Sequence, residues 1–509
     1  MALQVCAKKR NCPQVPFRQG AAKANARLTF EALFFKNPLS SSRIRKLAGS
    51  ASMQTIVPQL LGMALFFAFS KWLPKEAFGQ MGWCTATAYL IATFASFGLE
   101  QVVFRRLAAG GDSSNWAAKA FWVHNLATAA LALLLLLSLA AFSASPQIQL
   151  LPFFFAAQAA LSLAMPFRLL LNARLQYGGY AFATITANLV KLAAAYGCHK
   201  AGILTLPVVA AVLVGGNALE YGLAWLVARK KQTAAFRPRA YRLLIKEALP
   251  QYLTVIFDVS LARLDWFLLG ILASAASVAE YSFAYRAYEV EKLPAAIVGS
   301  LLLPIVARWW TGDKKPAAAQ QKIFAVLLLL IPALMGWASL LVVLLWQPLV
   351  GGVLQSEFGS ASFIPLAILN LSMVLQFSIN LLWVQTFAAR QYRKIALLTA
   401  ATALLSLVLN LVLIPKWQTT GAALSLLLAA AFQLLGYARQ VQQLGLRLPW
   451  RKILFVWGMN ISGICVLLFC KMPLAVSGVG VLLGYPLLMW MGGIFAPAHR
   501  KILTGLKQS

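Results

Sequence analysis

Two apolar runs of membrane length dominate the stretch Lys246–Arg308, whose sequence is KEALPQYLTVIFDVSLARLDWFLLGILASAASVAEYSFAYRAYEVEKLPAAIVGSLLLPIVAR. A short turn of small residues near Ala273–Val278 joins the two runs. Charged residues nevertheless lie inside or beside them: Asp258, Arg263, Asp265, Arg286, Glu289, Glu291 and Lys292. A charge at the bilayer centre costs about 2.5–3.5 kcal/mol on insertion scales, so such residues normally face a bundle interior or a watery cavity.

The spacing of these charges predicts which of them lie together. Asp258 and Asp265 are seven residues apart and therefore share one face of a helix. Arg286 and Glu289 are three apart and can be neighbours on the next helix. Two interpretations remain open, and both can hold at once. One is a structural ion pair, such as Asp265–Arg286, that locks the two helices; the other is a polar cavity near the midplane that handles a charged substrate.

The composition predicts an all-α polytopic membrane protein. Hydrophobic residues make up 61% of the chain and charged residues 11%, against about 25% charged in soluble domains. A spanning helix needs about 20 apolar residues. Fourteen such segments are predicted, near 47–70, 78–98, 120–142, 149–171, 180–198, 203–228, 248–273, 278–304, 322–346, 363–386, 395–414, 419–437, 453–470 and 474–495.

The net charge of +32 follows the predicted topology. With both termini on one side of the membrane, that side holds 36 of the 45 lysines and arginines and the other side only five. Four more lie within spans, at Lys191, Arg263, Arg286 and Lys292. Because cytoplasmic loops carry the positive charge, both termini are predicted to be cytoplasmic. The basic excess therefore indicates topology, and no nucleic-acid partner is expected.

The longest predicted cytoplasmic loop, 229–246, separates two halves of six spans each. The predicted organisation is a basic cytoplasmic tail (1–45), an N-terminal six-helix lobe (46–230), a cytoplasmic linker (231–247), a C-terminal six-helix lobe (248–437), two additional spans (453–495) and a cytoplasmic tail (496–509). The halves echo one another, since WLPKEAFGQMG (72–82) resembles SAASVAEYSFA (274–284). Internal duplication is the expected build of a secondary transporter, with its site between the repeats.

Polar residues elsewhere in the spans add candidate cavity residues. Lys191 lies at about mid-depth of the fifth span, whereas Glu220 is expected to snorkel toward the inner end of the sixth. Polar stripes at helical spacing predict further interior-facing surfaces. They comprise Gln54 and Gln59, Gln158 and Ser162, and Ser372, Gln376 and Asn380.

Motifs for catalysis do not occur in the sequence. It contains no GxxxxGK[ST] loop, no HExxH and no nucleophile elbow, its six cysteines form no CxxC pair, and its three histidines are far apart. The predicted outer loops are short, which disfavours a membrane transferase or polymerase. We therefore expect no catalytic residue, no metal, no cofactor and no enzymatic activity.

Several segments resemble the polysaccharide transporter family, the Wzx-like O-antigen flippases of the multidrug/oligosaccharidyl-lipid/polysaccharide (MOP) superfamily. They are LPKEAFGQMG, FGLEQVVFRR, the LARLDWFLLG…YSFAYRAYE block and NLVLIPKWQTTGAALS. The resemblance extends over spans one to twelve, and its most telling part is Asn410–Ala423, where QTT replaces a glycine that often follows the proline. It implies two six-helix, MATE-like lobes around a central cavity, with the last two spans as an addition.

The cargo implied by this resemblance is an undecaprenyl-diphosphate-linked oligosaccharide, moved from the inner to the outer leaflet of the bacterial cytoplasmic (inner) membrane. Candidate cavity cations for its diphosphate are Lys191, Arg263, Arg286 and Lys292, with arginine offering paired donors. Asp258, Asp265 and Glu289 would separate these cations or bind a coupling H+ or Na+, and Gln376 and Asn380 are further cavity candidates. Expected partners are membrane lipids and a glycan polymerase or transferase. A MATE-type multidrug or cation antiporter and a polytopic enzyme of envelope glycan assembly remain the alternatives.

Overall fold

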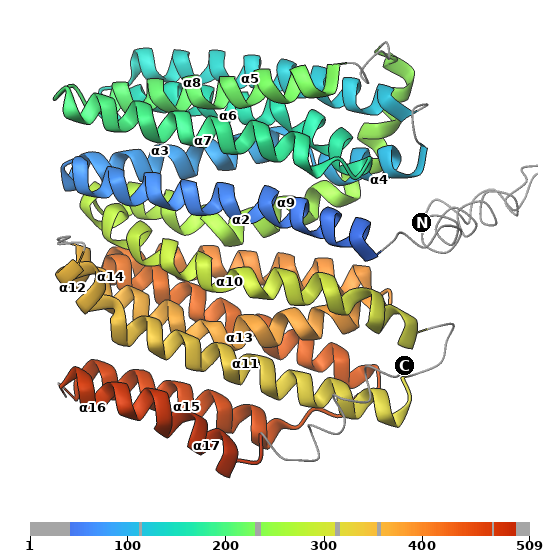
Figure 1. Cartoon of the computed structure of the whole chain (residues 1–509), viewed down its shortest axis with the longest axis vertical. Helices are drawn as coiled ribbons and strands as arrows, with labels where there is room; N and C mark the ends of the chain where they lie inside the picture. The colour runs from blue at the N-terminus through green and yellow to red at the C-terminus, as the bar shows by residue number, and fades with distance from the viewer. Residues whose placement is uncertain are drawn as a thin grey trace, which may run out of the picture.

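The computed structural model describes residues 41–110, 114–229, 236–310, 316–353, 358–470 and 473–494. Within these ranges the chain is helical and contains no strand, as predicted (Figure 1). Most of the two predicted tails and part of the predicted linker, residues 231–235, lie outside the described ranges.

The N-terminal half is built from seven helices. These are α2 (Ser41–Trp72), α3 (Lys75–Ala95), α4 (Leu99–Gly110), α5 (Asn115–Phe142), α6 (Pro146–Ala173), α7 (Tyr177–Lys200) and α8 (Leu206–Ala228). Helix α6 packs against α3, α5 and α8, and α2 packs against α7. Phe97 and Gly98 have positive φ, which turns the chain by 56° between α3 and α4. Proline starts α6, where its missing N–H removes a donor that would be unpaired anyway.

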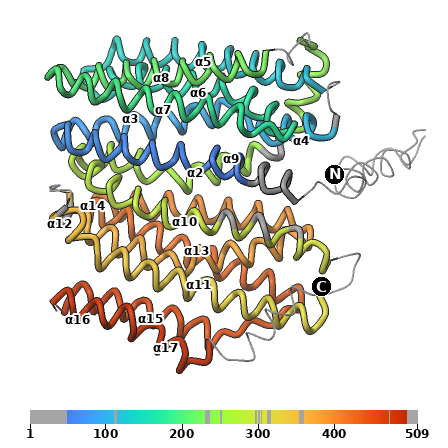
Figure 2. Tube along the Cα trace, viewed as in Figure 1, coloured from blue at the N-terminus to red at the C-terminus, as the bar shows by residue number. Residues whose placement is uncertain are grey.

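The C-terminal half continues the helical bundle. It comprises α9 (Pro238–Leu272), α10 (Ala275–Trp309), α11 (Ala318–Trp346), η3 (Gln347–Val353), α12 (Phe358–Ala361), α13 (Phe363–Ala388) and α14 (Tyr392–Gln443). Helix α13 is the most buried of the candidate spans, because α10, α11 and α14 surround it. The last helices, α15 (Trp450–Phe469), α16 (Leu474–Val479), η4 (Gly480–Gly484) and α17 (Tyr485–Met491), lie at one edge of the bundle beside α11 (Figure 2).

Helix α14 is two helices that meet at a sharp backbone break. Gln418 has φ 45° and ψ −119°, which interrupts the helix between the predicted spans 395–414 and 419–437. Gly421 allows the chain to fold tightly there, since a Cβ on it would lie 2.3 Å from the carbonyl oxygen of Leu413. The break therefore lies in the QTT segment, where this chain lacks the glycine that often follows the proline in the family that it resembles.

Each of the fourteen predicted spans falls on helical segments. By length and composition, however, ten described helices can cross a membrane, or eleven when the bent α3–α4 pair is one span. Helices α9 and α10, which carry the charges quoted at the start, are not among these ten. Helix α14 is counted once, although it is broken and covers two predicted spans. The protein is thus a multi-pass membrane protein, while the number fourteen and the lobe boundaries stay predictions.

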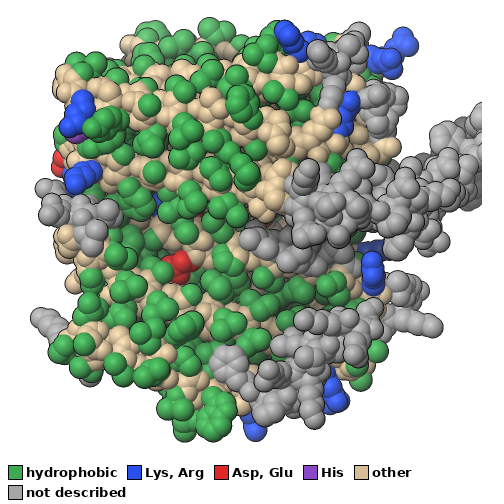
Figure 3. Space-filling model, viewed as in Figure 1, with side chains coloured by type: hydrophobic (Ala, Val, Ile, Leu, Met, Phe, Trp, Pro, Cys, Tyr) green, Lys and Arg blue, Asp and Glu red, His purple; other side chains and the backbone are tan. Residues whose placement is uncertain are grey.

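The surface and the two ends of the bundle fit a membrane. Hydrophobic side chains cover the middle of the face in Figure 3, and lysines and arginines lie toward its edges. We name the two ends by their residues. The turn end holds the α2–α3 turn (73–74) and the α9–α10 turn (273–274); the α4 end, opposite, holds α4 and the start of α9.

Candidate functional site

Three of the predicted cavity residues meet between α9 and α10 in an Arg–Glu–Arg cluster of Arg263, Glu289 and Arg286. Arg263 Nη2 donates to Glu289 Oε1 at 2.6 Å, and Arg286 Nη1 donates to Glu289 Oε2 at 2.8 Å. The three side chains are between 21% and 33% exposed, so the cluster is partly accessible. One carboxylate thus holds two guanidinium groups, and the cluster keeps one net positive charge.

Aromatic rings surround the two arginines. The guanidinium of Arg263 lies 5.2 Å from the ring centre of Trp266 and 5.7 Å from that of Tyr89. The guanidinium of Arg286 lies 5.0 Å from the ring centre of Phe66. Cations are attracted to ring faces at these distances. Because Phe66 belongs to α2 and Tyr89 to α3, the Arg–Glu–Arg cluster lies where the two halves of the protein meet.

The ion pair Asp265–Arg286, offered as one interpretation of the sequence, is replaced by other contacts. Asp265 is buried and accepts hydrogen bonds from the Tyr281 hydroxyl at 2.6 Å and from the Trp266 backbone N–H at 2.9 Å. Arg286 instead pairs with Glu289 on its own helix. Asp265 still ties α9 to α10, but through a tyrosine.

The other candidates of the C-terminal half lie outside this cluster. Lys292 is half-buried, with its ammonium 5.2 Å from the ring centre of Tyr288. Asp258 shares the predicted face with Asp265 but is exposed. On α13, Gln376 is half-buried, and Asn380 packs against α10, where a Cβ at Gly299 would lie 2.9 Å from its Oδ1.

Lys191 lies in a different place, inside the N-terminal half. It is buried and donates to Asn217 Oδ1 at 2.9 Å. Glu220, on the same helix as Asn217, is 4% exposed and accepts from the Tyr180 hydroxyl at 2.7 Å. The prediction that Glu220 snorkels was therefore wrong, because Tyr180 supplies a partner in the protein interior.

Tyr180, Lys191 and Glu220 line a cavity of about 480 Å³, which we call the polar pocket. Helices α2 to α8 all contribute to it. Its polar lining includes Gln54, Gln59, Tyr89, Glu100, Asn125, Gln158, Ser162, Arg168, Asn188, Lys191 and Glu220. Two of the stripes predicted to face the interior, on α2 and on α6, thus meet here. The sequence did not predict Asn125, Asn188 or Arg168 as pocket residues. Arg168 was counted instead among the 36 lysines and arginines of the cytoplasmic side.

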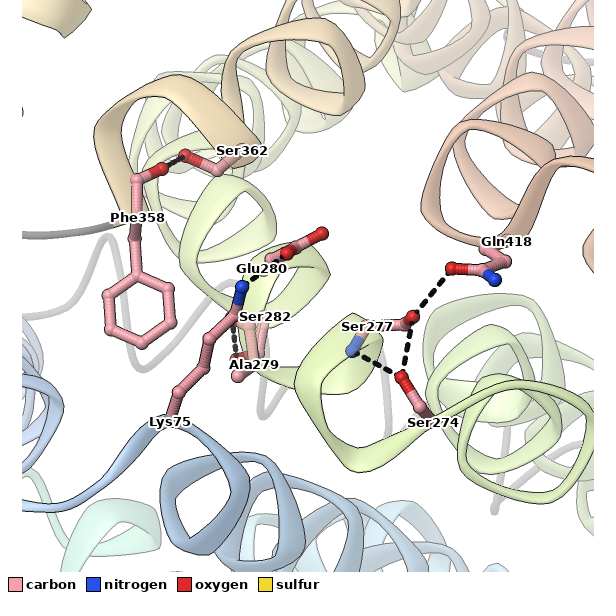
Figure 4. Close-up of polar contacts among 9 residues, drawn as sticks. All are labelled: Lys75, Ser274, Ser277, Ala279, Glu280, Ser282, Phe358, Ser362 and Gln418. Carbon is pink, nitrogen blue, oxygen red and sulfur yellow. Dashed lines mark hydrogen bonds and ion pairs between the residues drawn. The ribbon is translucent and has the colours of Figure 1, made fainter.

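Polar contacts hold the start of α10 at the turn end (Figure 4). Lys75 Nζ, at the start of α3, lies 2.6 Å from Glu280 Oε1 of α10. Ser277 Oγ of α10 donates to Gln418 Oε1, at the break of α14, at 2.9 Å. Ser274 caps α10 by accepting from the Ser277 backbone N–H at 3.1 Å. The start of α10 is thereby fixed to both α3 and α14.

Small residues let the helices approach closely at the same end. A Cβ on Gly79 would lie 1.7 Å from the carbonyl oxygen of Ala275. The two segments that echo one another in the sequence therefore touch, as a pseudo-two-fold arrangement of repeats would place them. Buried side chains seal this contact: Phe78, Val278, Tyr281 and Phe283 are fully buried. Farther along α3 Tyr89 is exposed, whereas these side chains at the turn end are buried, so the halves are closed together there.

A second set of contacts anchors the start of α9 at the α4 end. Glu247 pairs with Arg106 and lies 3.5 Å from Arg105, both on α4. His124 of α5 lies 2.8 Å from the Tyr241 hydroxyl and 2.8 Å from the Ala95 carbonyl. Helix α9 therefore contacts the N-terminal half at both ends, α4 and α5 with its first turns and α3 with its last, and it also packs against α14.

Comparison with known proteins gives the family and the fold. The family model described as polysaccharide biosynthesis protein matches residues 44–310, more than half of the chain. No curated protein matches the chain. Among solved structures, the lipid II flippase MurJ in an inward closed conformation aligns with a TM-score of 0.68 at 15% identity, covering 87% of this chain and 98% of that chain.

Two multidrug transporters share the fold as well. The MATE multidrug transporter DinF-BH aligns with a TM-score of 0.56 at 13% identity, over 79% of this chain and 96% of its own. An inward-facing MATE family transporter of the MOP superfamily aligns at 0.55 and 15% identity, over 78% of this chain and 99% of its own. These neighbours are flippases and transporters, not enzymes. With a family model that spans α2 to α10, this chain belongs to the polysaccharide biosynthesis protein family, and it shares its fold with MurJ and with MATE transporters.

Proposed function

We propose that this protein is a flippase that moves an undecaprenyl-diphosphate-linked oligosaccharide from the inner to the outer leaflet of the bacterial cytoplasmic membrane. The family membership and the fold shared with MurJ support transport of a lipid-linked glycan. A diphosphate–sugar headgroup cannot cross about 30 Å of hydrocarbon unaided, whereas its polyprenyl tail can stay in the lipid. A protein cavity must therefore carry the headgroup.

The Arg–Glu–Arg cluster is the observation that carries this proposal. It places two guanidinium groups at the interface between the halves, 21% and 33% exposed. Arginine binds phosphate through paired N–H donors, and such charge-assisted bonds are stronger than neutral ones. Glu289 occupies these donors in the empty protein. We propose that the diphosphate takes its place, so that the arginines exchange one anion for another.

Alternating access then requires the two ends of the bundle to open in turn. The turn end is closed by the Lys75–Glu280 pair and by the buried contacts around Gly79. The predicted topology assigns this end to the outer side. In the proposed cycle this closed arrangement loads the headgroup from the cytoplasmic side, and separation of the turn end releases it outside.

The leaflet position of the glycan lipid tests the proposal. In a deletion strain, intact spheroplasts are probed with a lectin or glycosidase that cannot enter, before and after lysis. The proposed function predicts glycan that accumulates but becomes reachable only after lysis, with recovery on complementation. Glycan that is reachable without the protein would contradict a flippase and favour the antiporter alternative, which dye and cation efflux assays examine.

A further inference from the structure

We infer that the polar pocket is a binding site for the hydroxyl-rich, lipid-proximal sugars of the cargo, separate from the Arg–Glu–Arg cluster. This inference rests on the proposed function and assigns a second part of the substrate to a second site. The pocket lies within the N-terminal half and is bounded by α2 to α8. Its volume of about 480 Å³ falls within the range of small-ligand sites, about 300–1,000 Å³.

The chemistry of the pocket suits an uncharged polyol. Its two cations, Arg168 and Lys191, are matched by two carboxylates, Glu100 and Glu220, so the lining has no net charge. Five amides add both N–H donors and carbonyl acceptors. They are Gln54, Gln59, Asn125, Gln158 and Asn188. A sugar hydroxyl both donates and accepts hydrogen bonds, so alternating donors and acceptors match it better than they match an anion.

Unpaired polar atoms in the lining point to a ligand. Gln54 Oε1 and Arg168 Nε are buried without a hydrogen-bond partner among the described residues. Asn217 accepts only one of the three N–H bonds of Lys191. A buried polar group without a partner costs about 1–3 kcal/mol. A bound hydroxyl group next to these atoms would remove that cost.

The position of the pocket matches the order of groups in the cargo. Tyr89 lines the pocket, and its ring also lies 5.7 Å from the guanidinium of Arg263. One side chain thus borders both sites. In a lipid-linked glycan the first sugar is bonded directly to the diphosphate, so adjacent sites for phosphate and sugar are what the covalent structure requires. Thr55 and Gln59 on the pocket wall are exposed, which leaves room for the remaining sugars to extend outward.

Binding of two lipid probes to the full-length protein in nanodiscs tests this assignment. The probes are undecaprenyl diphosphate and undecaprenyl-diphospho-N-acetylglucosamine. We expect the wild-type protein to bind the sugar-bearing lipid at least about tenfold more tightly, the effect of about 1.4 kcal/mol of additional hydrogen bonding. Gln158→Leu, inside the pocket, should abolish this preference and leave the affinity for undecaprenyl diphosphate unchanged. Gln54→Leu, on α2, should have the same effect.

The matched control is Gln149→Leu, an exposed glutamine on the same helix α6, which should retain the full preference. Arg286→Ala should weaken both lipids together. Equal wild-type affinity for the two lipids, or equal weakening of both by Gln158→Leu and Gln54→Leu, would overturn the sugar assignment alone. Failure of the wild-type protein to bind either lipid would overturn the proposed function, and the sugar assignment with it.

Discussion

At the scale of single residues, Arg286 contributes both a hydrogen bond and an unused donor. Its Nη1 binds Glu289, while its Nε is buried without a partner among the described residues. The planar guanidinium can therefore offer a second N–H to an incoming phosphate oxygen. Lysine in its place would keep the charge but lose the fixed pair of donors.

We accordingly predict that Arg286→Ala abolishes flipping while the protein still inserts into the membrane, and that Arg286→Lys retains part of the activity. The spheroplast assay measures flipping, and immunoblotting of membranes measures abundance. If Arg286→Ala only lowers abundance and the remaining protein works normally, the arginine has a structural role and the phosphate assignment is wrong.

Two glutamates on α10, two residues apart, have opposite surroundings. Glu289 is held by two arginines. Glu291 is 9% exposed; its Oε2 accepts from Ser339 Oγ at 3.0 Å, and its Oε1 is buried without a partner in the described part of the chain. A buried carboxylate costs several kcal/mol unless cations compensate it. The first glutamate therefore stabilises its site, whereas the second is tolerated at a cost.

Neutralising each glutamate should reveal this difference. We predict that Glu289→Gln destabilises the protein by about 1–3 kcal/mol, because two arginines lose charge-assisted hydrogen bonds. Glu291→Gln should leave stability unchanged or raise it, because the amide can still bind Ser339 and carries no charge. Midpoints of heat-induced unfolding in detergent measure both variants. Equal destabilisation by the two changes would contradict this account.

At the scale of elements, the start of α10 links three helices at the turn end. Gln418 explains how α14 takes part, because its backbone break directs the side chain toward Ser277. A non-glycine residue in such a conformation costs about 1–3 kcal/mol. The hydrogen bond with Ser277, worth about 1 kcal/mol, offsets part of this cost. This bond fixes the start of α10 within the C-terminal half, and the Lys75–Glu280 pair joins it to α3 and so closes the turn end.

The Lys75–Glu280 pair provides a direct test of this closure. The pair is partly exposed, at 28% and 22%, and is worth about 1 kcal/mol, so its loss should raise the open population about fivefold. We predict that Lys75→Glu increases the labelling rate of a cysteine placed at buried Val278 by about that factor, for an impermeant thiol reagent in a cysteine-free background. Adding Glu280→Lys should restore slow labelling. An unchanged rate in the single variant would show that the pair does not hold the turn end closed.

At the scale of the whole molecule, the proposed transport moves a charged headgroup across the membrane potential. The diphosphate carries about two negative charges, and an inside-negative potential favours outward movement by roughly 2.3 kcal/mol per charge per 100 mV. The two partly exposed arginines would bind the headgroup, while the protein itself would move little net charge across the membrane. The potential itself can then provide the direction, without a coupling H+ or Na+.

We predict that net outward flipping in proteoliposomes depends on an inside-negative potential and needs no H+ or Na+ gradient. A valinomycin-imposed potassium potential drives the assay, and its collapse should slow net transport of the glycan lipid. Arg286→Ala proteoliposomes serve as the inactive control. Flipping at full rate after the potential and every ion gradient have been removed would contradict this mechanism.

Sequence alone predicted the features that depend on composition and local pattern. The long apolar runs identified an all-helical membrane protein, and the spacing of Arg286 and Glu289 within one helix predicted their contact. The segments after spans one and seven were identified as related. The family resemblance was confirmed by the match over 44–310. These properties depend on residues within a few turns of one another, or on sums over a segment, and so need no knowledge of packing.

Only the tertiary structure decided which distant residues meet. Asp265 turned out to face Tyr281 rather than Arg286, and Lys191 proved to lie in the polar pocket rather than with the arginines. Lys75 and Glu280 are 205 residues apart, and nothing in either segment alone indicates that they form a pair. Helical spacing determines the face on which a side chain lies, but the neighbour of that face depends on how whole helices pack. That packing follows from the close approach of small residues such as Gly79, and it is a property of the folded chain.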